Sequence, residues 1–174
     1  MIGKVYSIWI IGLPGAGKTT LANELEKKFN QKQIHVKVLD GDVLRAGINN
    51  NLGFSEADRY ENIRRSAEVS RLFSRSKIST INAFICPTKA LRDLARNIVG
   101  ADHYLEVYLN TPLEVCERRD PKGLYKRARN GEISNFTGID AAFEVPVSSH
   151  LVINTANEKA EATAARVFSF LVNR

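Results

Sequence analysis

Short apolar runs of strand length alternate along the chain with longer stretches in which apolar residues recur at helical spacing. The runs are rich in β-branched and aromatic residues and predict five strands, at residues 5–11, 34–39, 78–86, 103–109 and 151–153. The stretches between them predict helices over about 21–29, from 55 onwards, over about 90–98, from 111 onwards and over about 158–172. Strands that alternate with helices indicate a three-layer α/β fold, with a mostly parallel sheet and helices on both faces.

Two of these helices begin with recognisable capping residues. Ser55 stands three positions before Asp58, the spacing at which a serine caps the first turn of a helix. Thr111 is followed by Pro112 and Glu114. This order predicts Thr111 as the cap, Pro112 in the first helical position and Glu114 reaching back to the cap.

The length and composition are those of one globular domain, which we expect to cover residues 1–174. Apolar residues make up 44% of the chain and charged residues 25%, which excludes a disordered, collagen-like or coiled-coil protein. The longest nearly apolar stretch, residues 5–13, is far below the ~20 residues needed to cross a bilayer, and its flanks do not predict a signal peptide. We therefore expect a soluble, cytoplasmic protein with no membrane partner.

The chain carries 25 Lys and Arg residues against 19 Asp and Glu residues, a formal net charge of +6. Such an excess suits nucleic acid, an anionic surface or a small phosphorylated substrate. Six basic residues fall between Arg118 and Arg129, with Asp120 as the only acid among them. A solvated helix face is the common interpretation of such a run, but Gly123 and the turn-forming Asp120-Pro121 favour a mobile basic lid over about 118–138.

A glycine-rich segment directly after the first predicted strand carries the clearest chemical signal. Residues 12–19 match the P-loop pattern G-x-x-x-x-G-K-[ST] at every position, so a glycine-rich turn without a ligand is the weaker alternative. Lys18 would reach the β- and γ-phosphates of ATP, and the Thr19 hydroxyl would hold Mg²⁺. The predicted ATP-binding residues are Gly12, Leu13, Pro14, Gly15, Ala16, Gly17, Lys18, Thr19 and Thr20.

Two carboxylates follow the second predicted strand, as Asp40-Gly41-Asp42. Side chains at the carboxyl end of a parallel strand face the place where open α/β sheets bind ligands. One carboxylate can support the magnesium shell while the other accepts a proton from an attacking hydroxyl. The alternative is a turn that makes only local hydrogen bonds. Because the chain has no N-K-x-D motif for reading guanine, a small-molecule kinase is favoured over a GTPase.

Four further groups of residues accompany the P-loop. They are Leu39-Asp40-Gly41-Asp42 with Arg45; Leu52-Gly53-Phe54-Ser55 with Asp58-Arg59 and Glu61-Asn62-Ile63-Arg64-Arg65; Arg119-Asp120-Pro121-Lys122-Gly123-Leu124-Tyr125; and Asn135-Phe136-Thr137-Gly138-Ile139-Asp140. In this order, they make the chain resemble the adenylyl-sulfate (APS) kinase family. The resemblance implies a P-loop kinase fold and transfer of the γ-phosphoryl group of ATP to the 3′-hydroxyl of adenosine 5′-phosphosulfate. It also implies a homodimer.

The resemblance also implies roles for individual residues. Catalysis would rest on Lys18, on Asp40 in the magnesium shell with Thr19, and on Asp42 as the base that orients the 3′-hydroxyl. On the acceptor side, Arg45 and Arg59 would grip the phosphosulfate, Asn62 would add a polar contact, and Phe54 and Phe136 would sandwich the base. Lys122, with Gly123 and Leu124, would close over both substrates. The full predicted acceptor-binding set is Asp42, Arg45, Phe54, Arg59, Asn62, Ile85, Cys86, Lys122, Gly123, Leu124, Asn135 and Phe136.

Residues 85–92 depart from the family pattern, because Cys86 stands where many members have a serine assigned as a phosphoserine intermediate. Direct in-line transfer is therefore the simpler mechanism. A small buried filler is a better interpretation of Cys86 than a reactive thiol. The change leaves a cytidine 5′-diphosphoramidate open as an alternative acceptor. A basic P-loop switch or nucleic-acid-binding protein is the remote alternative, and we expect no nucleic-acid partner because no nucleic-acid module signature is present.

Overall fold

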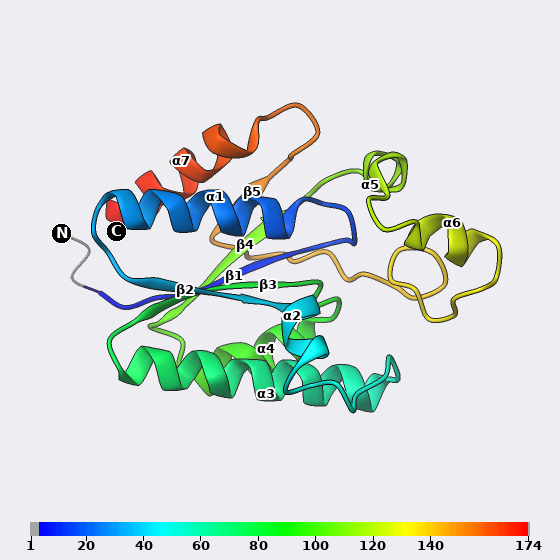
Figure 1. Cartoon of the computed structure of the whole chain (residues 1–174), viewed down its shortest axis with the longest axis horizontal. Helices are drawn as coiled ribbons and strands as arrows, with labels where there is room; N and C mark the ends of the chain where they lie inside the picture. Colours follow the sequence, from blue (N-terminus) through cyan, green and yellow to red (C-terminus); the bar gives the residue numbers. More distant parts are fainter. Residues whose placement is uncertain (1–3, 174) are drawn as a thin grey trace.

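Five parallel strands form the central sheet of the computed structural model, which describes residues 4–173 (Figure 1). They are β1 (Ser7–Gly12), β2 (Val36–Asp40), β3 (Ser79–Phe84), β4 (Tyr104–Leu109) and β5 (Leu151–Ile153). Their order across the sheet is β2-β3-β1-β4-β5, and every pairing is parallel. The central strand β1 pairs Ile8 with both Ile81 and Leu105. All residues of β1, β3 and β4 are buried, so β1 and β4 are nearly continuous apolar runs in the sequence. β3 also buries three polar residues, Ser79, Thr80 and Asn82, whose side chains are hydrogen-bonded.

Helices cover both faces of the sheet (Figure 1). The helices α1 (Lys18–Gln31) and α7 (Ala160–Val172) pack on one face, and α3 (Glu56–Arg75) and α4 (Lys89–Val99) pack on the other. The three shorter helices lie toward the carboxyl ends of the strands and are α2 (Gly41–Ala46), α5 (Leu113–Arg119) and α6 (Leu124–Arg129). The elements that follow β1, β2 and β4 therefore meet at one edge of the sheet, where open α/β folds bind ligands.

Alternate residues of β1 contribute to two apolar layers. Ile8 and Ile10 belong to the layer beneath α1 and α7, with Leu25 among its fully buried members. Trp9 and Ile11 belong to the layer beneath α3 and α4. Because the central strand is fixed from both sides, the loop that follows it begins from a rigid position.

The five predicted strands and five predicted helices are all present, with ends that differ by a few residues. The Ser55 cap is confirmed, because its side chain accepts a hydrogen bond from the Asp58 amide at 3.1 Å. The predicted Thr111 cap is wrong. Pro112 is the cap residue of α5 without any side-chain bond, and the Thr111 hydroxyl instead lies 2.8 Å from that of Thr155. The short helices α2 and α6 were not predicted. Within residues 4–173, no helix is both long and apolar enough to span a membrane.

Candidate active site

The P-loop connects the end of β1 to the start of α1 at Lys18. Gly15 and Gly17 have φ angles of 73° and 96°, in the left-handed region that side chains with a Cβ disfavour. A Cβ on Gly15 would lie 2.8 Å from the carbonyl oxygen of Cys116, so the loop packs too closely on α5 for any larger residue. These positions are therefore glycine for steric reasons, and the loop leads directly into the positive end of a 14-residue helix.

The Lys18 side chain is half-buried and folds back onto this loop. Its ammonium group donates hydrogen bonds to the carbonyl oxygens of Gly12 at 3.1 Å and Leu13 at 2.7 Å. Burial lowers the pKa of Lys18 to about 8, although Cys116, Asp42 and Asp40 act in the opposite direction. Bound phosphate would replace the carbonyl contacts with a full negative charge, which favours the ammonium form.

The Asp40-Gly41-Asp42 segment joins the P-loop to β2. The Thr19 hydroxyl donates to Asp40 Oδ2 at 2.6 Å, and Asp40 Oδ1 accepts from the Asp42 amide at 2.8 Å as the cap of α2. The alternative of a turn with only local hydrogen bonds is therefore wrong. A Cβ on Gly41 would lie 3.1 Å from the Phe84 ring, so the close fit of this segment on β3 accounts for the glycine.

Thr19 and Asp40 offer only oxygen atoms as metal ligands, and Mg²⁺ prefers such hard ligands. Among residues 4–173, no group of three or more His, Cys, Asp or Glu side chains could hold a metal ion by itself. This arrangement suits an ion that enters with nucleotide phosphates and keeps several of its waters. Thr19 and Asp40 therefore fit a Mg–ATP site.

The lid reaches this edge through Lys122, whose ammonium group forms an ion pair with Asp42. Both side chains are largely exposed, at 57% and 70%. Gly123 follows with φ 66° and begins α6, and the Asp120 carboxylate accepts hydrogen bonds from the amides of Tyr125 and Lys126. The basic run therefore extends from the end of α5 through a turn that carries Lys122 into α6, and Lys122 contacts the proposed base.

Arg59 connects the two segments that carry the predicted aromatic pair. Its Nε donates to the Phe54 carbonyl at 3.0 Å, its Nη1 to the Thr137 hydroxyl at 3.1 Å, and its Nη2 to the Asn135 carbonyl. The Asp140 carboxylate accepts from the amides of Asn135 and Phe136 and so shapes the same turn. One guanidinium group therefore ties the start of α3 to a turn 78 residues further along the chain.

The two aromatic residues have different environments. Phe54 is 61% exposed, and the Arg45 guanidinium lies 4.5 Å from its ring centroid while donating to the carbonyls of Leu52 and Gly53. Phe136 is only 8% exposed and meets Tyr125 edge to face at 5.0 Å. One face of Phe54 is therefore partnered by a cation, and Phe136 is part of the core. Their sandwich around a base stays a prediction.

Comparisons with known proteins agree with this geometry. Residues 4–154 match the family described as Adenylylsulphate kinase. This chain belongs to the adenylyl-sulfate kinase family. It is 53% identical to the adenylyl-sulfate kinase of Bacteroides thetaiotaomicron over 165 residues, 95% of this chain and 82% of that one. It is 49% identical to the enzyme of Clostridium kluyveri over 94% of this chain and 82% of that one.

A solved member of the adenylyl-sulfate kinase family has the same fold. The APS kinase CysC of Mycobacterium tuberculosis, in complex with AMPPNP and APS, superposes with a TM-score of 0.93 at 41% identity. The alignment covers 97% of this chain and 98% of that chain. The α/β architecture with five parallel strands is therefore the fold of this family.

Besides Phe136, two predicted acceptor residues of this adenylyl-sulfate kinase family member are buried. Asn62 is 5% exposed, and its side-chain oxygen accepts a hydrogen bond from Asn49 at 3.0 Å. Cys86 is 1% exposed with φ 46°, and its carbonyl accepts from Arg92. Burial raises the pKa of the Cys86 thiol, which disfavours the reactive thiolate and supports its interpretation as a filler. Ile85 is half-buried, between the end of β3 and Cys86.

Two residues beside the P-loop were missed as site residues. Arg119 donates to the hydroxyl and carbonyl of Thr155 and approaches the Gly15 carbonyl at 3.5 Å. The Tyr125 hydroxyl donates to the Pro14 carbonyl at 2.9 Å, so this tyrosine joins the P-loop to Phe136. Both lie in the predicted lid, 118–138, but no sequence pattern distinguishes them from its other residues.

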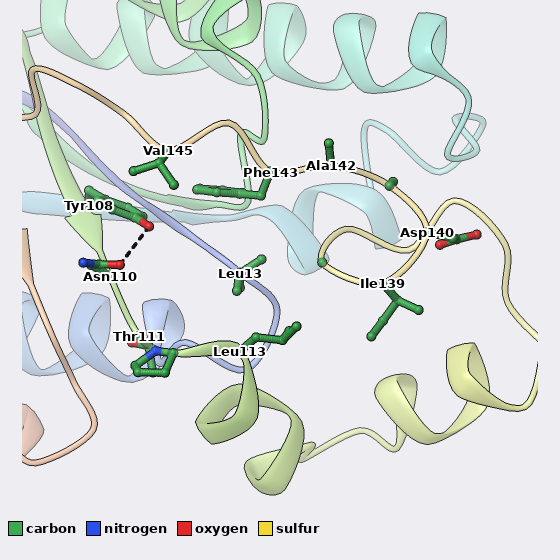
Figure 2. Close-up of a pocket in the computed structure, with 13 residues that line it drawn as sticks. Leu13, Tyr108, Asn110, Thr111, Leu113, Ile139, Asp140, Ala142, Phe143 and Val145 are labelled. Atoms are coloured by element: carbon green, nitrogen blue, oxygen red, sulfur yellow. Dashed lines mark hydrogen bonds between the residues drawn. The ribbon is translucent and has the colours of Figure 1, made fainter.

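A cavity of about 640 Å³ adjoins the P-loop at Leu13 (Figure 2). Tyr108 and Asn110 line it from the end of β4, Leu113 from the start of α5, and Phe143 from the segment after Asp140 (Figure 2). Leu13 is the only predicted site residue in its lining. The cavity is therefore separate from the predicted acceptor set.

Proposed function

We propose that this chain transfers the γ-phosphoryl group of ATP to the 3′-hydroxyl of adenosine 5′-phosphosulfate. The observation that carries this proposal is the continuous line of contacts from Thr19 through Asp40 and Asp42 to Lys122. It brings together the P-loop, the carboxylates after β2 and the lid. The names of the relatives, and the AMPPNP and APS present in the complex of the Mycobacterium tuberculosis structure, support the same donor and acceptor.

On the donor side, the P-loop amides bind the triphosphate and Lys18 compensates the charge that moves between the β- and γ-phosphates. Thr19 and Asp40 would hold Mg²⁺, which neutralises phosphate charge when it is bound. Asp42 accepts the proton of the 3′-hydroxyl. The hydroxyl oxygen bonds to the γ-phosphorus while the bond from the γ-phosphorus to ADP breaks and ADP departs. Lys122 excludes water from the transferring group when the lid is closed.

On the acceptor side, Arg45 and Arg59 would bind the phosphosulfate oxygens through the N–H groups that the protein itself leaves available. Asn62 would add a neutral donor. Phe54 and Phe136 would hold the base, and the remaining predicted contacts are those of Ile85, Cys86, Gly123, Leu124 and Asn135.

Phosphoryl transfer from radiolabelled ATP tests this function directly. Adenosine 5′-phosphosulfate and a cytidine 5′-diphosphoramidate serve as acceptors in parallel, each with and without Mg²⁺. We expect turnover that depends on Mg²⁺ and on the adenosine acceptor, and none with Lys18→Ala. Turnover with the cytidine acceptor alone would overturn the substrate assignment, and near-normal rates for Lys18→Ala would overturn the assignment of the P-loop.

The lid over 118–138 and a homodimer belong to the same proposal. Light scattering after size exclusion measures the mass of the particle against the 19.4 kDa of one chain. A particle of that single mass, active at assay concentration, would refute the dimer without affecting the proposed reaction.

A further inference from the structure

Asn49 is a buried polar residue for which the reaction described above has no use. It lies in the turn between α2 and α3, and its side chain is fully buried, at 0% exposure. Its amide nitrogen donates to the side-chain oxygen of Asn62 at 3.0 Å, while its own side-chain oxygen is buried without a partner. Burying an amide in this way is costly, so the position calls for an explanation.

The direction of this hydrogen bond determines which end of the Asn62 amide is left free to bind another group. Since Asn49 donates, the Asn62 oxygen is occupied and its NH₂ group is the remaining end. Within residues 4–173, the side-chain nitrogen of Asn62 makes no hydrogen bond. The buried side-chain atoms without a partner do not include this nitrogen, so it is exposed to solvent. The reverse polarity would bury the two N–H donors of Asn49 without partners. That costs more than one unpaired carbonyl oxygen.

The position of Asn62 on α3 indicates where this NH₂ group lies. Arg59 and Asn62 are three residues apart on the same helix and therefore share a face. Arg59 uses that face to reach Asn135 and Thr137. The donor end of Asn62 thus lies on the side of α3 that faces the predicted acceptor residues.

We propose that Asn49 is a positioning residue that fixes the Asn62 amide so that its NH₂ group, and not its oxygen, faces the terminal group of the acceptor. This inference rests on the proposed function. A sulfate end offers only acceptor oxygens and matches that donor. A terminal phosphoramidate carries two free oxygens and one NH₂ group. With Arg45 and Arg59 donating to the other two positions of the end group, its NH₂ group would face a donor in every orientation. The pair therefore selects for an end group without N–H donors.

The test compares two acceptors that share adenosine and differ only at the end group, adenosine 5′-phosphosulfate and adenosine 5′-diphosphoramidate. Asn49→Leu removes the donor and keeps the branching of the side chain, and Asn50→Leu is the matched control, since Asn50 is exposed in the same turn. Asn62→Leu and the double variant complete a cycle. Steady-state kcat and KM are measured for both acceptors and for ATP, with thermal unfolding in parallel.

We expect the wild type to prefer the phosphosulfate by at least about tenfold in kcat/KM, the scale of one hydrogen-bond mismatch. Asn49→Leu should raise the KM for the phosphosulfate about tenfold. It should leave kcat and the KM for ATP within about twofold and reduce the preference between acceptors. Asn62→Leu should show the same loss, and adding Asn49→Leu to it should change nothing more. Asn50→Leu should match the wild type.

Several results would overturn the inference. One is equal use of the two acceptors by the wild type, a measurement that needs no variant. Another is a loss in Asn49→Leu that adds fully to that of Asn62→Leu, and a third is a lowered melting temperature with an unchanged KM, as for a purely structural residue. If Asn49→Leu does not fold, Asn49→Ala is read by the same criteria. A wild type without activity on the phosphosulfate overturns the proposed function first and the inference with it.

Discussion

The hydrogen bond between Arg59 and Thr137 can be removed without altering any predicted site residue. Thr137 is 2% exposed, and its hydroxyl accepts from Arg59 Nη1 at 3.1 Å. A valine keeps the shape of the side chain but offers no acceptor. We expect Thr137→Val to loosen the turn that carries Asn135 and Phe136, and thereby to weaken acceptor binding.

The size of the effect follows from the contacts of Arg59. A hydrogen bond to a charged donor contributes about 1.5–3 kcal/mol. Arg59 is half-buried and keeps its bond to the Asn135 carbonyl, so the lower end of that range applies. About 1.5 kcal/mol corresponds to roughly a tenfold smaller population of the docked turn, and hence to a KM for the acceptor raised by up to about tenfold. The KM for ATP should change by less than about twofold.

Two measurements test this prediction: the KM for the acceptor, and the hydrogen-exchange rates of residues 135–137. Thr163→Val is the matched control. Thr163, in α7, is also buried, and its hydroxyl also makes one hydrogen bond, to the carbonyl of the cap residue Lys159. The control should lose stability while the acceptor KM and the exchange rates of residues 135–137 stay as in the wild type. If Thr137→Val behaves like the control in both measurements, the bond from Arg59 to Thr137 does not hold the acceptor side together.

Three further predictions concern the donor side and the lid. Because burial lowers the pKa of Lys18 to about 8, the free lysine loses its charge above that pH, whereas bound phosphates favour the charged form. The affinity for AMPPNP should therefore be constant below pH 8 and fall by up to about tenfold per pH unit above it. Calorimetry in two buffers should detect the proton taken up on binding, and a constant affinity above pH 8 would contradict the lowered pKa. Asp42→Asn should lower kcat by about 10²–10⁴-fold with AMPPNP affinity nearly unchanged, and an effect on KM alone would reassign Asp42. Lys122→Met removes an exposed ion pair worth at most about 1 kcal/mol, so the melting temperature should shift by only a few degrees while kcat falls; unchanged kcat would remove Lys122 from the mechanism.

Buried strands and long helices could be predicted because their signals are local. The strands β1 and β4 are buried throughout, and each appears in the sequence as a nearly continuous apolar run. The helices α2 and α6 have only six residues each, too few for a helical period to be visible. They form where a neighbouring carboxylate satisfies their first amides, from Asp40 in α2 and from Asp120 in α6.

In the candidate site, too, local features could be predicted from the sequence and contacts between distant segments could not. The P-loop is one contiguous segment with a fixed pattern, so its residues could be named from the sequence. The contact of Tyr125 with Pro14 spans 111 positions and that of Arg119 with Thr155 spans 36, and no periodicity reports such pairs. The Thr111 cap was predicted wrongly for the same reason. Its hydroxyl bonds to that of Thr155, 44 positions further along the chain, instead of capping α5.

The contacts of the lid differ in how much it costs to break them. Tyr125 is buried against Phe136 and the P-loop, so separating it would expose two aromatic side chains, each worth about 1.5–3 kcal/mol of burial. The ion pair of Lys122 with Asp42 is exposed on both sides and contributes at most about 1 kcal/mol. Breaking the Lys122 contact is therefore less costly than detaching α6, and it would free Asp42, the proposed base. Under the proposed function, the same opening would let product leave while Tyr125 keeps Phe136 attached to the P-loop.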